Sequence, residues 1–182
     1  MKPNIFQENY EKEVLANQAK IASRIEGDFA EVGVYMGRSA EIIKQNAPNK
    51  RLHLFDTFTG LPDMVLPEDE KHYLKPGDMA VDFKAVKDYL KKYDNIFINR
   101  GIFTGKEAKD NRFAFVHIDV DIYHSTKTVI EFFYQRMNKD GIMLIHDYPI
   151  HSGVRRAIDE FLKDKQVNLV QSGSRQLIIT KL

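Results

Sequence analysis

Short apolar runs that alternate with helix-like segments are the feature that most restricts how this chain can fold. Each run is followed by apolar residues at helical spacing. Continuous apolar strands in this alternation are typical of a parallel sheet covered by helices on both faces. The expected strands lie at the start of GDFAEVGVYMGRSAEIIKQ (27–45) and in RLHLFDTF (51–58), NIFINRG (95–101), RFAFVHID (112–119) and GIMLIHD (141–147).

The segments between these runs complete the same pattern. Helical spacing predicts helices over residues 5–25, around 83–90 and around 154–162. A cap at Ser125 or Thr126 is expected to begin another helix, whose apolar stripe runs from Val129 to Met137. VNLVQSGSRQLIITKL (167–182) predicts two strands around a Ser-Gly-Ser turn. The prediction is an α/β fold with a seven-stranded, mostly parallel sheet, helices on both faces and a C-terminal β-hairpin.

Composition excludes several classes of protein. Hydrophobic residues make up 43% and charged residues 29%, and the net charge of +1 comes without a basic stripe for nucleic acid. The absence of cysteine excludes disulfides, thiolate metal sites and a cysteine nucleophile. The N-terminus is too polar for a signal peptide, and no apolar run approaches membrane-spanning length. We expect a cytoplasmic protein that acts on a small molecule, without nucleic-acid or membrane partners.

The length of 182 residues predicts a single domain over 1–182. Residues 1–26 form an N-terminal helical segment that is expected to act as a lid or as a dimer element, so a homodimer stays open. Residues 57–82 contain GLP, LPEDE and KPGD without a clear period. A loop this long inside a compact domain predicts a lid over the substrate.

Acidic residues close four of the expected strands. They are Glu31, Asp56, Asp119 and Asp147. The carboxyl ends of parallel strands share one edge of the sheet, and ligands bind outside that edge. Because a buried carboxylate is costly without a partner, we expect these acids to surround one reactive pocket and a ligand to occupy the space between them.

A glycine motif follows the first strand. EVGVYMGRSA places Gly33 and Gly37 before a helix, where the backbone can approach a ligand closely and free N–H groups can hold an anion. Tyr35 stands where the dinucleotide fingerprint requires its second glycine. The motif therefore favours a ligand that carries a carboxylate over a pyrophosphate, and a simple strand-to-helix turn stays an alternative.

Asp56 closes the second strand about 20 residues after the glycine turn, which suits an acid that binds two ribose hydroxyls. Its alternative role is a turn cap. A nucleoside cofactor without pyrophosphate agrees with both features, and S-adenosylmethionine is the natural candidate. Gly101, in the NRGIF stretch after the third strand, is then expected near the adenine.

Four segments together resemble one family. GDFAEVGVYMGRSA, LFDTFTGLPD, FVHIDVDIYHSTKTVIEFF and GIMLIHDYPIHSGVRRAIDEF are similar to the macrocin-type sugar O-methyltransferases of antibiotic biosynthesis, whose relatives act on mycinamicin and noviose precursors. The resemblance spans residues 27 to about 162. It implies a class I methyltransferase (Rossmann-like) fold, S-adenosylmethionine as methyl donor and, in several members, a magnesium ion. Members of the family are longer as a rule.

The resemblance also implies roles for individual residues. Asp119 matches the acid that serves as metal ligand or proposed base, and Asp147 matches the second acid of an Asp-Asp-Tyr motif. His146 stands in this chain where the family has the first of these acids. The residues that match the family's cofactor site are Glu31, Gly33, Tyr35, Gly37, Ser39 and Asp56.

Methyl transfer to a hydroxyl requires alignment of the acceptor and removal of its proton. Two hypotheses follow for the ends of the fourth and fifth strands. In the first, Asp119, His146 and Asp147 bind a divalent metal, magnesium or manganese, although imidazole suits a transition metal better than magnesium. In the second, no metal binds tightly, and His146 or Asp119 acts as the general base.

Other polar residues near these strand ends have simpler interpretations. Asp121 is expected to be a solvated acid or a cap, His117 to be structural, and His151 to be a loop histidine or a second base candidate. Two functions compete with an O-methyltransferase. One is a non-catalytic protein of the same fold that binds the cofactor, and the other is a nicotinamide-dependent oxidoreductase, which the missing glycine disfavours.

Overall fold

A computed structural model describes residues 5–64, 66–70 and 74–182. Within these residues, seven strands form one sheet in the order β3-β2-β1-β4-β5-β7-β6. The strands are β1 (Asp28–Val32), β2 (Leu52–Asp56), β3 (Ile96–Arg100), β4 (Phe113–Ile118), β5 (Met137–Ile145), β6 (Val167–Gln171) and β7 (Leu177–Lys181). The helices are α1 (Ile5–Ala22), α2 (Arg38–Asn46), α3 (Pro67–Glu70), α4 (Phe83–Leu90), α5 (Tyr123–Tyr134) and α6 (Ser152–Leu162), with a short 3₁₀ helix at Lys106–Ala108.

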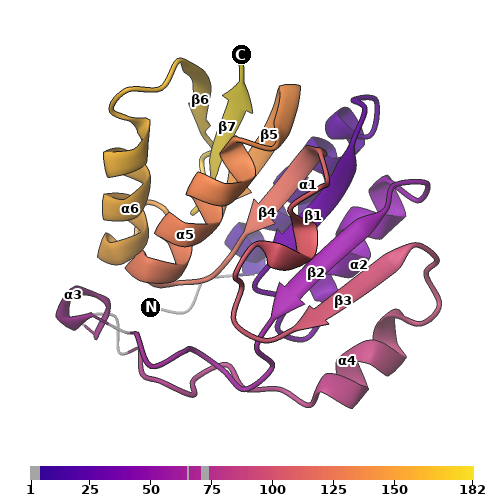
Figure 1. Cartoon of the computed structure of the whole chain (residues 1–182), viewed down its shortest axis with the longest axis horizontal. Helices are drawn as coiled ribbons and strands as arrows, with labels where there is room; N and C mark the ends of the chain where they lie inside the picture. Colours follow the sequence, from indigo (N-terminus) through magenta and orange to yellow (C-terminus); the bar gives the residue numbers. More distant parts are fainter. Residues whose placement is uncertain (1–4, 65, 71–73) are drawn as a thin grey trace.

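Strands β1 to β5 are parallel, and β7 pairs antiparallel with both β5 and β6. The chain order reverses between β1 and β4, where the sheet continues outward in both directions (Figure 1). At this reversal Val32 of β1 is level with Ile118 of β4, and Ile118 is level with Ile145 of β5. The three strands therefore end at one height, which brings the residues that follow them together.

Helices cover both faces of the sheet. Helices α1, α2 and α4 pack on one face, around a core that includes Phe29, Leu54 and Leu144. Helices α5 and α6 pack on the other face, around Val116 and Ile145. Figure 1 shows these three layers, and the central strand β4 is buried along its whole length. The predicted α/β sheet with helices on both faces and a terminal hairpin is confirmed.

Two details of the predicted helices were wrong. Helix α5 begins at Tyr123 and not at Ser125 or Thr126, and the Thr126 hydroxyl donates to the carbonyl of Ile122 from inside the helix. Met137, assigned to the apolar stripe of that helix, is instead the first residue of β5. The helix ends three residues earlier because Arg136 bonds back to Phe133 through its backbone, and the chain then enters the sheet.

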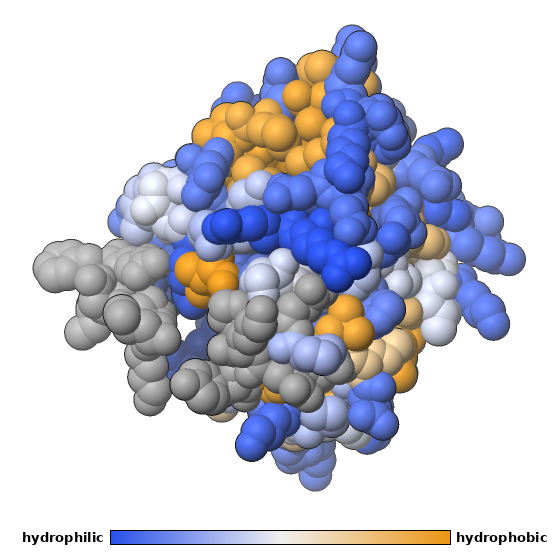
Figure 2. All heavy atoms as spheres, turned by 90° about the vertical axis from the view of Figure 1, so that its left-hand side faces the viewer, coloured by the Kyte–Doolittle hydropathy of each residue, from blue (hydrophilic) through white to orange (hydrophobic). Residues whose placement is uncertain are grey.

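The segment 57–82 crosses the end of the sheet and contains the short helix α3 (Figure 1). It is tied to itself by backbone bonds between Leu61 and Asp78 and between Gly77 and Leu61. Figure 2 views the molecule from the left-hand side of Figure 1 and shows a surface of mostly hydrophilic residues with separate apolar groups. In the described ranges, no helix combines the length and apolar character that crossing a membrane requires.

Candidate functional site

A pocket of about 860 Å³ opens at the carboxyl ends of the parallel strands. The residues after β1, β2, β3, β4 and β5 all contribute to its wall, as does the turn between β6 and β7. Six of the residues predicted for cofactor or chemistry line it from β1 to β4, and the two predicted residues after β5 line it as well. They are Gly33, Tyr35, Ser39, Asp56, Gly101 and Asp119, followed by His146 and Asp147.

Gly33 forms the sharpest part of the turn after β1. Its φ of +88° favours glycine, and an added Cβ would lie 1.8 Å from the backbone oxygen of Asp119. The turn therefore packs directly against the end of β4. Gly37 also has a positive φ, +79°, and caps helix α2, but it faces Leu90 and Val86 of α4 rather than the pocket.

Asp56 organises this turn. Its Oδ2 accepts backbone N–H bonds from Val34 at 2.7 Å and from Tyr35 at 2.9 Å, and its Oδ1 accepts one from Phe58 at 2.7 Å. The capping role that the sequence left as an alternative is therefore present. Asp56 also lines the pocket, and its Oδ1, which accepts one of these three bonds, can accept a further hydrogen bond. Binding to ribose hydroxyls stays a prediction.

Glu31 lies beneath the pocket and not in its wall. The side chain is fully buried, and its Oε1 lies 2.8 Å from Nδ1 of His117, which confirms a structural position for that histidine. Although His117 opposes it, burial raises the pKa of Glu31. Its Oε2 has no hydrogen-bond partner among the described residues. Glu31 therefore supports the glycine turn from below. A cofactor in the pocket could contact Oε2 of Glu31 only if the turn moved aside.

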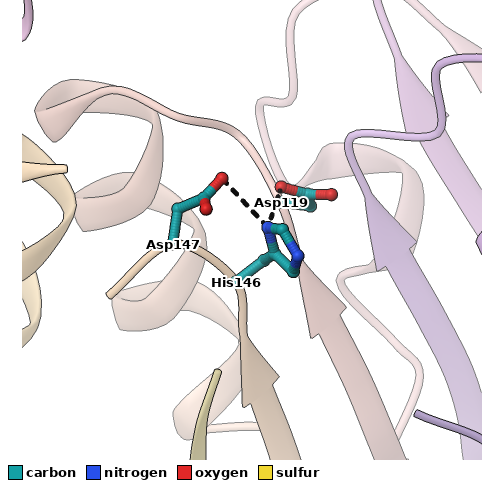
Figure 3. Close-up of side chains that lie close together, drawn as sticks. All are labelled: Asp119, His146 and Asp147. Atoms are coloured by element: carbon teal, nitrogen blue, oxygen red, sulfur yellow. Dashed lines mark ion pairs between the residues drawn. The ribbon is translucent and has the colours of Figure 1, made fainter. Parts of the chain in front are cut away.

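The acid after β4 meets the pair after β5. Nδ1 of His146 lies 3.2 Å from Oδ1 of Asp119 and 2.9 Å from Oδ2 of Asp147 (Figure 3). The imidazole points between the two carboxylates, which come from neighbouring strands. The side chains of His146 and Asp147 are 15% and 8% exposed, whereas that of Asp119 is 33% exposed and offers the most accessible carboxylate of the three.

These contacts fix the charges. Burial disfavours the charged form of Asp119, but His146 outweighs it and holds the pKa of Asp119 below its ordinary value. Burial likewise opposes a charge on His146, yet Asp119, Asp147 and Glu11 together raise the pKa of His146 well above its ordinary value. Both pKa shifts favour the same arrangement, an ionised Asp119 beside a protonated imidazole.

Two charged residues of this site were missed from the sequence. Arg175, in the turn between β6 and β7, makes two hydrogen bonds of 2.8 Å to the carboxylate of Glu11 in α1. Its Nη1 lies 3.2 Å from Oδ1 of Asp147. Glu11 in turn lies 3.5 Å from Nε2 of His146. The two partners are 164 positions apart, so no local sequence pattern predicts their contact. The one feature that could have drawn attention to it is the arginine in the predicted hairpin turn.

Asp121 is not the solvated acid that the sequence suggested. Its side chain is 16% exposed, and its Oδ1 lies 3.4 Å from Nδ1 of His151. The strand ends before it, and a φ of +61° turns it inward. Burial raises the pKa of Asp121 well above its ordinary value, and the charges of Asp119 and Asp147 add to this effect. His151 thus joins the rim of the site.

Two groups of residues among those described could bring three ligand atoms around a cation. One comprises Asp119, His146 and Asp147, and the other comprises Asp121, Asp147 and His151. In each group the atoms lie within 4.8 Å of one another. The groups share Asp147, so they form one continuous polar rim.

Comparison with known proteins adds a family. A family model described as macrocin O-methyltransferase (TylF) matches residues 11–171. The chain is 25% identical over 157 residues to an 8-demethyl-8-(2,3-dimethoxy-α-L-rhamnosyl)-tetracenomycin-C 4′-O-methyltransferase of Streptomyces olivaceus. It is 24% identical over 157 residues to the demethyldecarbamoylnovobiocin O-methyltransferase of Streptomyces niveus. Each match covers 78% of this chain and 60% of the relative, so the chain spans about 60% of the length of these relatives.

Among solved structures, the O-methyltransferase NovP superposes with a TM-score of 0.80 at 20% identity, over 94% of this chain and 79% of that chain. This likeness confirms the class I methyltransferase fold that the sequence predicted.

Proposed function

Because the chain belongs to the macrocin O-methyltransferase (TylF) family, we propose that it is an S-adenosylmethionine-dependent O-methyltransferase that methylates a hydroxyl group of a small molecule. The first relative named above acts on a rhamnosyl-tetracenomycin, which supports a sugar or a sugar-bearing metabolite as the acceptor. The identity of the acceptor depends on residues 57–82 and on the pocket mouth. We propose that this segment is the lid, because Gly60, Leu61, Pro62, Met64 and Met79 line the pocket.

One observation carries the proposal. A single pocket joins the glycine turn and Asp56 on one side to Asp119 and His146 on the other. A binding protein requires only the first part, whereas methyl transfer also requires a base beside the acceptor. The chain offers both within one cavity, which favours the enzyme over the non-catalytic alternative.

The residues present fit the methyl donor. The turn approaches a ligand closely at Gly33, Asp56 can accept hydrogen bonds from a ribose, and Gly101 has open space above its Cα for an adenine. When bound, S-adenosylmethionine supplies a methyl group whose bond to sulfur is already activated. The pocket residues hold the donor and exclude water, so that only an aligned hydroxyl can react.

Asp119 and His146 are proposed to manage the proton. The carboxylate of Asp119, ionised and the more exposed of the two, accepts a hydrogen bond from the acceptor hydroxyl. As the acceptor oxygen forms its bond to the methyl carbon, the hydroxyl proton passes to Asp119. Nδ1 of His146 lies 3.2 Å from Oδ1 of Asp119, where it orients the carboxylate and leaves Oδ2 for the hydroxyl. Asp119 would also be the acid that faces the positive charge of a bound donor, since it lines the same pocket as Gly33 and Asp56.

A divalent metal is the less favoured of the two hypotheses. Magnesium prefers an all-oxygen shell, and His146 contributes a nitrogen. A transition metal would accept that nitrogen. However, Asp147 already faces His146 with one oxygen and Arg175 with the other. The residues present therefore do not fit a divalent ion in this arrangement.

The test is a comparison of cofactors followed by turnover. Calorimetry should show binding of S-adenosylhomocysteine and none of NADH. Asp56→Ala should weaken that binding, because it removes both the turn cap and the ribose acceptor. Asp78→Ala is the matched control, since the carboxylate of Asp78 also accepts a backbone N–H bond, from Lys75, but lies outside the pocket wall. Unfolding curves of both variants separate loss of binding from loss of fold.

The outcomes are distinct. Binding of NADH in preference to S-adenosylhomocysteine would support the oxidoreductase instead. Binding of S-adenosylhomocysteine with no methyl transfer to any sugar-type hydroxyl would support the non-catalytic alternative. A cytoplasmic location and a homodimer that uses the N-terminal helix stay predictions, and gel filtration with light scattering tests the second.

A further inference from the structure

Arg175 stands where the site has most negative charge. Its guanidinium comes from the β6–β7 turn, which follows the last residue of the family match, and it lines the same pocket as Asp119 and Asp147. Its side chain is 19% exposed, and those of Glu11 and Asp147, which it contacts, are both 8% exposed. The guanidinium is therefore a built part of the wall and not a surface charge.

The turn that carries Arg175 is held firmly. The hydroxyls of Ser172 and Ser174 lie 2.7 Å apart, and that of Ser172 also donates to the carbonyl of Gln176. The Gln176 amide donates to the backbone oxygen of Glu11. The Ser-Gly-Ser turn is thus closed on itself before Arg175 and fastened to helix α1 directly after it. This fastening fixes the guanidinium against Glu11, with which it forms the bidentate pair that arginine makes best.

The position of the guanidinium matters for a cation. A divalent ion held by Asp119, His146 and Asp147 would have to take an oxygen of Asp147 that lies 3.2 Å from Nη1 of Arg175. Like charges this close repel strongly, and partial burial weakens the screening by water. Displacing Arg175 is costly, because the buried Glu11 would lose both hydrogen bonds to the guanidinium and keep only its longer contact with His146.

We propose that Arg175 supplies, from within the chain, the positive charge that a divalent ion would bring to Asp147, and that it excludes such an ion from this rim. Arg175 is then a positioning residue: it neutralises Asp147, which together with Asp119 holds the imidazole of His146 in place. The inference depends on the proposed function in one respect: it takes Asp119, His146 and Asp147 to be the residues beside which the acceptor hydroxyl binds. It makes methyl transfer by this chain independent of divalent metal.

The experiment measures uptake of Mn²⁺ by electron paramagnetic resonance, with S-adenosylhomocysteine present. The proteins are the wild type, Arg175→Lys, and the double variant Glu11→Gln with Arg175→Gln, which removes the pair without leaving one charge buried alone. Lys91→Gln is the control for loss of one positive charge, because Lys91 follows the last residue of α4, its side chain is 73% exposed, and it is distant in sequence from the rim. No acceptor is needed, so the result is independent of whether methyl transfer is found.

We expect no detectable Mn²⁺ uptake by the wild type, Arg175→Lys or Lys91→Gln. The double variant should bind Mn²⁺ with an affinity at least about tenfold above the upper limit that the assay sets for the wild type. The gain should disappear when Asp147→Asn is added, which locates the ion. Methyl transfer by the wild type should be unchanged by a chelator. Stoichiometric Mn²⁺ uptake by the wild type would overturn the proposal. So would a double variant that folds and still takes up no ion, because Arg175 would then not be what excludes it.

Discussion

The close approach of Gly33 to Asp119 gives the sharpest prediction, which concerns Gly33→Ala. The added Cβ would meet the backbone oxygen of Asp119 at 1.8 Å and its carbonyl carbon at 2.7 Å. Both partners are backbone atoms, and the backbone N–H of Asp119 is itself bonded to the carbonyl of Val32. The end of β4 must therefore move away from the turn by roughly 1 Å before the methyl group fits.

The expected cost has two parts. A positive φ costs an L-residue about 1–2 kcal/mol, and forcing an atom into a packed region costs a further ~1–3 kcal/mol. Gly77→Ala is the matched control, because Gly77 has nearly the same φ, +85°, but nothing lies within 4 Å of its added Cβ. The difference in unfolding free energy between the two variants isolates the second part, about 1–3 kcal/mol in disfavour of Gly33→Ala.

Urea unfolding at one temperature measures both free energies, and the slope of each curve shows whether the two-state comparison is valid. Displacing the Asp119 backbone also moves its carboxylate, so Gly33→Ala should lose about 100-fold in methyl transfer under conditions where it is still folded. Gly77→Ala should retain its activity. Equal stabilities for the two variants would refute the close approach of the turn to β4, and with it the shared wall of the pocket.

Three further predictions follow. Burial would raise the pKa of Glu11, but Arg175 and His146 lower it to about 2. The ionised Glu11 therefore stabilises the fold above the ordinary glutamate pKa of 4.5, and this stabilisation is lost as the pH falls from 4.5 toward 2. Urea unfolding between pH 5 and 3 should show a steeper loss of unfolding free energy in the wild type than in Glu11→Gln. Asp119→Asn should reduce methyl transfer by about 10²–10⁴-fold in a radiolabel assay while calorimetry finds S-adenosylhomocysteine still bound, and an active variant would remove the proposed base. In Gly153→Ala the added Cβ would meet Oδ1 of Asp69 at 1.8 Å, so α3 should detach from α6, and limited proteolysis within 57–82 should accelerate; an unchanged cleavage rate would contradict this contact.

Sequence reasoning predicted the strand ends well because it used two strong signals. The apolar runs of β1, β2, β4 and the second half of β5 are buried on both faces of the sheet, so their sequences show no alternation of apolar and polar residues. The acids after them break those runs abruptly. Parallel pairing then brings the residue after β4 beside the residues after β5, since Ile118 is level with Ile145. The sequence alone therefore predicts that Asp119 and His146 lie together.

The missed features depend on tertiary contacts. Met137 continues the apolar spacing of α5, and only the pairing of Met137 with Phe113 shows that it belongs to the sheet. The pair of Glu11 and Arg175 joins an N-terminal helix to a C-terminal turn. The residues next to either partner in the sequence give no indication that the two side chains meet. Charge pairs between distant segments leave no periodic signal, so the positive side of this site was invisible in the sequence.

These pairs change the reason why acids can lie at the rim of a buried sheet. The sequence suggested that a ligand keeps them charged, but the chain already balances several of them. Glu31 is beside His117, and Asp147 lies between His146 and Arg175. Asp119 differs, because a third of its side chain stays exposed to the pocket while His146 covers only one of its oxygens. The fold thus neutralises the structural acids and leaves the carboxylate of Asp119 accessible, which is the requirement for a base that must meet a hydroxyl group.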